Sequence, residues 1–135
     1  MESSDMYQEN ILDHYRNPDN FGKLENPDIK SHDLNPLCGD ELAVTIKLNK
    51  NVIEDIKFSG KGCAISMASA DIVSEFLKGK PLDDVKKLGR QDVLGMLGIE
   101  VSYVRLKCAL LILKVVKSGV YSFLGQKLDT DSTSF

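Results

Sequence analysis

The side chains best suited to chemistry are three cysteines, and each stands beside a feature that favours metal or sulfur chemistry over packing. Cys38 lies in a turn-forming run, and the carboxylate of Asp40 follows it by two residues. Three thiols and one carboxylate make a four-ligand set of the kind that holds zinc or a small iron–sulfur cluster. No two cysteines form a local pair, so only a folded chain can bring together Cys38, Cys63 and Cys108.

Each cysteine also has a packing interpretation. Cys63 opens a predicted helix, where backbone amides favour a thiolate, but small residues also suit a tightly packed helix start. Cys108 precedes an aliphatic run in which a thiol is commonly buried, whereas Arg105 and Lys107 just before it favour a thiolate. The residues alone leave both roles open.

The elements that must position these side chains begin with a helix over residues 5–16, which Asn17-Pro18 stops. A short strand is predicted over residues 29–34. Apolar residues alternate over residues 41–48 and continue over 52–59, which predicts an antiparallel hairpin turning at residues 49–51.

Helical periodicity dominates the second half of the chain. It predicts a helix over residues 64–78, ended by Gly79, and a short helix over 81–88. Residues 92–97 are ambiguous because of their glycines, and a longer helix over 104–117 is expected to close at Ser118-Gly119. Residues 128–135 read as a loose tail, so we expect one domain over residues 1–127.

Composition excludes several classes of protein. The 135 residues carry a formal net charge of −3 with both signs interspersed, which argues against nucleic acid as a partner. No apolar stretch approaches the length of a membrane span. The polar, acidic N-terminal segment differs from a secretory or mitochondrial presequence. An odd number of cysteines without an export signal suggests reduced thiols in the cytoplasm.

Five segments together resemble one known family, the U-type iron–sulfur cluster scaffolds, which include IscU, SufU and the N-terminal domain of NifU. The resemblance spans nearly the whole chain except the tail, and the ordered combination is far more specific than any single cysteine. The segments are residues 7–18, Asn20-Phe21-Gly22, Cys38-Gly39-Asp40, residues 58–69 and residues 105–111.

The resemblance implies an α+β fold of the SufE/IscU-like type, with a small antiparallel sheet of about three strands packed against several helices. It implies that Cys38, Cys63 and Cys108 converge at one exposed end, with Asp40 beside them, and receive sulfur or bind iron for a [2Fe–2S] cluster. Zinc is another expected occupant of the purified protein. The expected partners are a cysteine desulfurase of the IscS, NifS or SufS type, apo-protein acceptors and a second copy in a homodimer. Such a protein is a carrier and not an enzyme.

Two departures from the family pattern keep alternatives open. IscU members usually have histidine before the last cysteine, where this chain has Lys107; SufU members have a basic residue there but an insertion between their second and third cysteines. The short spacing from Cys63 to Cys108 favours the scaffold. The chain also has Val-Ser-Tyr-Val-Arg at residues 101–105 in place of a Leu-Pro-Pro-Val-Lys chaperone motif. The alternatives are a SufU-like zinc-dependent sulfurtransferase and a structural zinc domain.

Without the histidine, Asp40 is the nearest fourth ligand. A carboxylate is a harder ligand than a thiolate and holds iron less firmly, which suits a protein that must release its cluster. By resemblance to IscU, Cys108 is expected to accept the first persulfide, with Lys107 as its electrostatic support.

Overall fold

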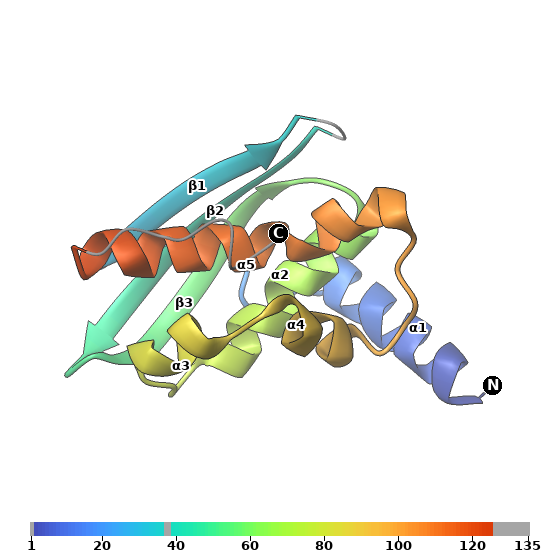
Figure 1. Ribbon diagram of the computed structural model, residues 1–135, viewed down its shortest axis with the longest axis horizontal. Coiled ribbons are helices and arrows are strands. Elements are labelled where there is room, and N and C mark those ends of the chain that lie inside the picture. Colours follow the sequence, from blue (N-terminus) through green and yellow to red (C-terminus); the bar gives the residue numbers. More distant parts are fainter. Residues whose placement is uncertain (1, 37–38, 126–135) are drawn as a thin grey trace.

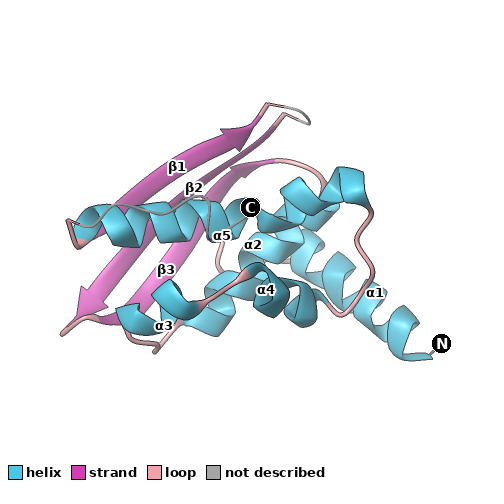
Figure 2. Cartoon of the chain, viewed as in Figure 1, coloured by secondary structure: helices cyan, strands magenta, loops and turns pink. Residues whose placement is uncertain are grey.

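The computed structural model describes residues 2–36 and 39–125, in which a three-stranded antiparallel sheet is covered by helices on one face (Figures 1 and 2). This architecture confirms the predicted α+β class. The elements in chain order are α1 (Glu2–Arg16), β1 (Ile29–Asn35), β2 (Asp40–Asn49), β3 (Val52–Lys61), α2 (Ala64–Leu77), α3 (Leu82–Lys87), α4 (Arg90–Leu97) and α5 (Tyr103–Phe123).

The sheet has the order β1-β2-β3, and its central hairpin turns as the sequence predicts. Asn49 pairs with Val52, and the two turn residues Lys50 and Asn51 have φ angles of 53° and 64°. Positive φ at both positions is typical of the type I′ turn, whose twist matches that of the strands. Alternate residues of β2 are buried from Leu42 onward, so one face of the sheet forms the floor of the core.

Helices α2 and α5 pack against that face and against each other, while α1 packs on α2 (Figure 1). The prediction that the last helix closes at Ser118-Gly119 is wrong, because α5 continues to Phe123. Gly119 is a packing position: a Cβ there would lie 2.9 Å from both Ile29 Cγ2 and Ser31 Cβ. The glycine lets the helix backbone approach β1, and tertiary packing outweighs its low helix propensity.

The ambiguous segment over residues 92–97 belongs to a helix, α4, which ends at Gly98 with a left-handed φ of 68°. Gly95 therefore does not prevent the helix. None of the described helices is long and apolar enough to cross a membrane. Residues 128–135, expected to form a tail, lie outside the described residues.

Three segments meet at one end of the sheet: the start of β2, the junction of β3 with α2, and the start of α5. β2 begins at Asp40, and its neighbour β3 ends at Lys61, with two residues between it and the start of α2 at Ala64. The first turns of α5 lie close to the same end (Figure 1). Strand pairing and helix packing thus bring three segments that are distant in the sequence into one place.

Candidate metal centre

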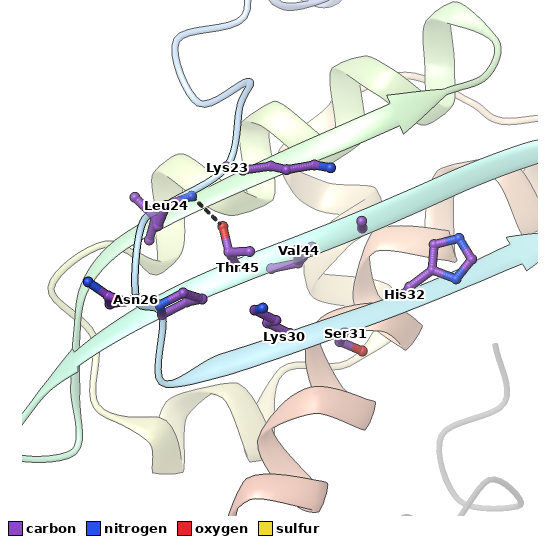
Figure 3. A pocket seen from close by; sticks show the side chains of 10 residues that line it. Lys23, Leu24, Asn26, Lys30, Ser31, His32, Val44 and Thr45 are labelled. Carbon is purple, nitrogen blue, oxygen red and sulfur yellow. Dashed lines mark hydrogen bonds between the residues drawn. The ribbon is translucent and has the colours of Figure 1, made fainter.

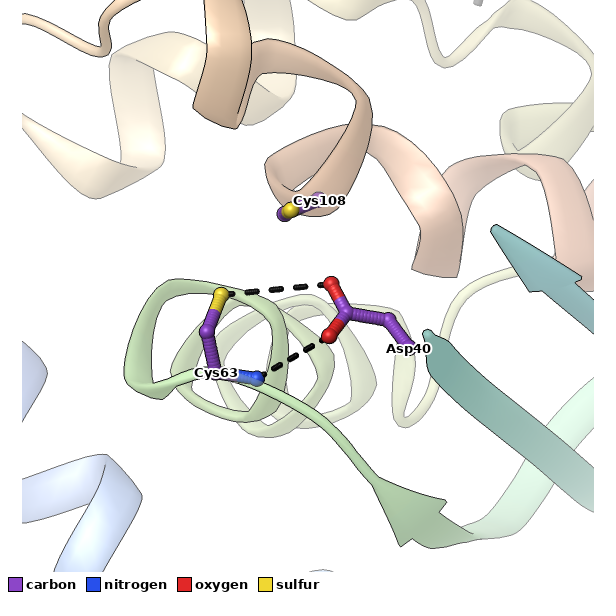
Figure 4. Close-up of side chains that lie close together, drawn as sticks. All are labelled: Asp40, Cys63 and Cys108. Carbon is purple, nitrogen blue, oxygen red and sulfur yellow. Dashed lines mark hydrogen bonds between the residues drawn. The ribbon is translucent and has the colours of Figure 1, made fainter. Parts of the chain in front are cut away.

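Asp40, Cys63 and Cys108 gather where those three segments meet. One ligand atom from each residue, a carboxylate oxygen and two sulfurs, lies within 4.8 Å of the other two. Figure 4 shows the three side chains converging on one space between α2 and α5. The convergence expected for these residues is therefore present in the fold.

Cys63 is the N-cap of α2, as its position at a predicted helix start suggested. Its Sγ accepts a hydrogen bond from the backbone N–H of Ser66, with a nitrogen–sulfur distance of 3.4 Å. The helix N-terminus places positive partial charge beside this sulfur. The start of α2 thus orients the Cys63 sulfur toward the end of the sheet where Asp40 lies.

Asp40 is held against Cys63 from the neighbouring strand. Its Oδ1 accepts a hydrogen bond from the backbone N–H of Cys63 at 3.1 Å, while its Oδ2 lies 3.9 Å from Cys63 Sγ. The residue is only 2% exposed. Gly39 before it has a φ of 74°, and its N–H donates to Asn35 O at 2.8 Å. This turn, which suits glycine, leads the chain into β2 at the carboxylate.

Gly62 leaves room for that carboxylate. A Cβ at this position would lie 2.7 Å from Asp40 Oδ1 and 3.2 Å from Ser66 Oγ. Any side chain here would therefore compete with Asp40 for space. The Gly60-Lys61-Gly62 run, which does not match a phosphate-binding loop, has a steric role at the site.

Cys108 is 1% exposed in the second turn of α5 and is followed by buried aliphatic residues. The packing interpretation describes its surroundings correctly, yet its sulfur also faces Asp40 and Cys63 (Figure 4). Both cysteines are free thiols. A buried thiol at this place can be both a core residue and a ligand.

Arg105 brings positive charge to the site from the first turn of α5. Hydrogen bonding with the Cys63 side chain, followed by the charge interaction with the same residue, raises the pKa of Arg105 above its usual value. The charges of Cys108 and Asp40 act in the same direction. The sequence suggested Arg105 only as a neighbour of Cys108. The interaction of Arg105 with Cys63 could not be predicted from the sequence, because it depends on how α5 packs against α2. Lys107 is exposed, two residues further along.

These sulfur and oxygen atoms suit a tetrahedral site for a metal ion such as zinc, which binds thiolates well. Zinc–sulfur bonds of about 2.3 Å place neighbouring ligands roughly 3.8 Å apart, so a metal would draw the 4.8 Å cluster inward only slightly. Two thiols and a carboxylate supply three of four ligands. Cys38, the fourth predicted ligand, lies outside the described residues and precedes Asp40 by two positions in the chain.

The first turn of α5 also carries exposed apolar side chains. Tyr103 is 89% exposed and Val104 is 76% exposed, immediately before Arg105. Both residues belong to the run at residues 101–105 that this chain has in place of the Leu-Pro-Pro-Val-Lys chaperone motif. Two neighbouring apolar side chains are thus open to solvent at the edge of the cysteine site.

A pocket of about 460 Å³ lies on the face of the sheet opposite the helices, between β1, β2 and the segment from Lys23 to Pro27 (Figure 3). Lys23, Lys30 and His32 contribute to its lining. No thiol or carboxylate is present among the described residues that line it. It therefore lacks the donors for a soft metal and is separate from the cysteine site.

Comparison with known proteins gives one consistent result. The family model described as NifU-like N terminal domain matches residues 6–130. The zinc-dependent sulfurtransferase SufU of Bacillus subtilis (strain 168) is 37% identical over 134 residues, covering 85% of this chain and 89% of SufU. The iron-sulfur cluster assembly scaffold protein IscU of Escherichia coli (strain K12) is 33% identical over 125 residues, covering 90% of this chain and 96% of IscU.

A solved structure agrees with these relatives. The crystal structure of a SUF-system scaffold protein from Fervidobacterium islandicum AW-1 superposes with a TM-score of 0.75 at 27% identity. The match covers 87% of this chain and 98% of that protein. The predicted SufE/IscU-like architecture is therefore confirmed at the level of the fold.

Proposed function

The chain belongs to the NifU-like N-terminal domain family, and on that premise we propose that it is a scaffold on which [2Fe–2S] clusters are assembled and from which they pass to apo-proteins. The observation that carries the proposal is the convergence of Asp40, Cys63 and Cys108 within 4.8 Å at one end of the sheet. Scaffold proteins bind and release their cargo, so the chain acts as a carrier and not as an enzyme.

We assign the cluster ligands to Cys38, Asp40, Cys63 and Cys108. The thiolates are soft ligands that favour iron–sulfur clusters, and the carboxylate is the harder ligand at which iron is held less firmly. Arg105 offsets part of the negative charge that three thiolates and one carboxylate bring together. Residues 1–127 then form the single domain that carries the site.

Sulfur delivery requires a partner, because no residue of the site can extract sulfur from an amino acid. A cysteine desulfurase supplies a persulfide, whose outer sulfur must gain two electrons before it becomes sulfide. We assign the first persulfide to Cys108, with Lys107 as a nearby positive charge.

The exposed Tyr103 and Val104 beside the site give the desulfurase an apolar surface to contact. We expect the protein to act in the cytoplasm, where cysteine side chains stay reduced.

A second function has one specific observation in its favour. The relative from Bacillus subtilis is a zinc-dependent sulfurtransferase, and it is 37% identical to this chain. Zinc accepts three thiolates and one carboxylate in a tetrahedral site, which the same four residues can supply. In this alternative, zinc organises the site and a cysteine takes the persulfide directly from the desulfurase.

The two functions are separated by anaerobic reconstitution with ferrous iron and sulfide, followed by measurement of visible absorption, iron and acid-labile sulfide. A scaffold should retain iron and sulfide in equal amounts after desalting. Loss of both, together with faster desulfurase turnover when the zinc-loaded chain is added, would instead establish the sulfurtransferase. Zinc binding with neither property would leave a structural zinc domain.

A further inference from the structure

Ser66 has a buried hydroxyl beside the site with no hydrogen-bond partner among the described residues. The residue is 0% exposed, and its Oγ remains unpaired. Ser69, one turn further along α2, shows the usual arrangement, because its Oγ donates to Ala109 O at 2.7 Å. A buried hydroxyl without a partner is destabilising, so a serine at this position needs an explanation.

The hydroxyl and the Asp40 carboxylate both border the space beside Gly62. The position of a Cβ on Gly62 would be 2.7 Å from Asp40 Oδ1 and 3.2 Å from Ser66 Oγ, so both oxygens border the same small volume. Ser66 is also tied to the other ligand, since its backbone N–H donates to Cys63 Sγ. Ser66 thus contacts one of the three converging residues, Cys63, and borders the same space as a second, Asp40.

We infer that Ser66 is a positioning residue, whose hydroxyl donates a hydrogen bond to the Asp40 carboxylate when that carboxylate ligates a metal. This inference rests on the proposed metal-binding role of Asp40. Oδ2, the oxygen nearer to Cys63 Sγ, is the one that would ligate, and Oδ1 would face Ser66. A carboxylate oxygen accepts more than one hydrogen bond, so Oδ1 can keep the Cys63 N–H and add the hydroxyl.

Metal binding supplies the reason for the unpaired state. A metal held by Asp40, Cys63 and Cys108 would draw these ligands inward from the 4.8 Å spacing, and the carboxylate would then shift relative to helix α2. Hydrogen bonds from a second layer of residues fix the orientation of such carboxylates and strengthen metal binding. On this proposal the Ser66 hydroxyl gains its partner when Asp40 turns toward a bound metal.

The chain offers a matched control in Ser74. Its side chain is also 0% exposed, and its Oγ likewise has no partner among the described residues. It lies two turns further along α2, about 12 Å from Ser66 at the usual helical rise. Ser66→Ala and Ser74→Ala therefore remove the same buried, unpaired group, but only one of them removes it from the site.

The test measures zinc affinity of the full chain by competition with a chromophoric chelator, and thermal unfolding of the metal-free protein. Both variants should unfold at the wild-type temperature or above it, because each loses an unpaired hydroxyl. Ser66→Ala should bind zinc about 10- to 100-fold more weakly, the usual effect of losing such a supporting hydrogen bond, while Ser74→Ala binds like the wild type.

A double-mutant cycle shows whether Ser66 acts through Asp40. In an Asp40→Ala background, Ser66→Ala should cause no further loss of zinc affinity. Equal affinity of Ser66→Ala and the wild type would overturn the inference while leaving the metal site in place, as would an equal loss in Ser74→Ala. A wild-type chain that binds no zinc would overturn both the inference and the metal-binding role on which it rests.

Discussion

Replacing Gly62 with alanine adds one methyl group directly against the Asp40 carboxylate. The new Cβ would lie 2.7 Å from Oδ1 and 3.0 Å from Cγ of Asp40. To reach an ordinary contact of about 3.5 Å, the carboxylate must move by roughly 0.8 Å. Metal sites tolerate errors of only about 0.2 Å in ligand distance, so this displacement is large.

The displacement also breaks a defined hydrogen bond. Asp40 is 2% exposed, and its Oδ1 accepts from the Cys63 N–H at 3.1 Å. Hydrogen bonds to charged groups contribute about 1.5–3 kcal/mol, so the metal-free Gly62→Ala variant should lose stability of this order. Zinc affinity should fall by roughly 10- to 100-fold, since each 1.4 kcal/mol corresponds to a factor of ten.

The assay combines urea unfolding of the metal-free protein with chelator competition for zinc. Gly95→Ala is the control, because a Cβ at Gly95 in α4 meets no atom within 4 Å. That variant should gain up to about 1 kcal/mol from helix propensity and bind zinc normally. If Gly62→Ala keeps both wild-type stability and wild-type zinc affinity, the reasoning about Asp40 is refuted.

Three further predictions concern ligation, sulfur delivery and packing. Serine in place of any one thiol should abolish stable cluster binding, measured as visible absorption and iron content, for each of Cys38, Cys63 and Cys108. Mass spectrometry after reaction with desulfurase and cysteine should find the first persulfide on Cys108, and Lys107→Glu should slow its formation more than Lys107→His does; persulfide mainly on Cys38 would favour the sulfurtransferase. Gly119→Val should destabilise the protein by about 1–3 kcal/mol in urea unfolding, because its Cβ would meet β1 at 2.9 Å, and an unchanged midpoint would contradict that packing.

Much of the fold could be predicted because local signals agree with it. Alternating apolar residues from Leu42 to Ile46 point to the buried face of β2, and the Asn49-Lys50-Asn51 run points to the hairpin turn. The end of α5 could not be predicted in this way. Gly119 has the local properties of a helix terminator, and only the proximity of β1 explains why the helix needs it.

The candidate ligands could be named from the sequence, whereas the residues that surround them could not. Cysteine type and helix position identified Cys63, which is the N-cap of α2. The contact of Arg105 with the Cys63 side chain and the buried hydroxyl of Ser66 arise from the packing of helices distant in sequence. A serine three residues after an N-cap is too common a signal to reveal such a role without the fold.

Cluster transfer tests the scaffold function most directly. The chain would be loaded anaerobically with iron, cysteine, desulfurase and a thiol reductant, desalted, and mixed with an apo-ferredoxin whose circular dichroism reports its own [2Fe–2S] cluster. A scaffold should lose its visible absorption as the ferredoxin signal grows, faster than iron and sulfide alone restore that signal at equal concentration. Failure to hold any cluster through desalting, or transfer no faster than free iron and sulfide, would contradict the proposed function.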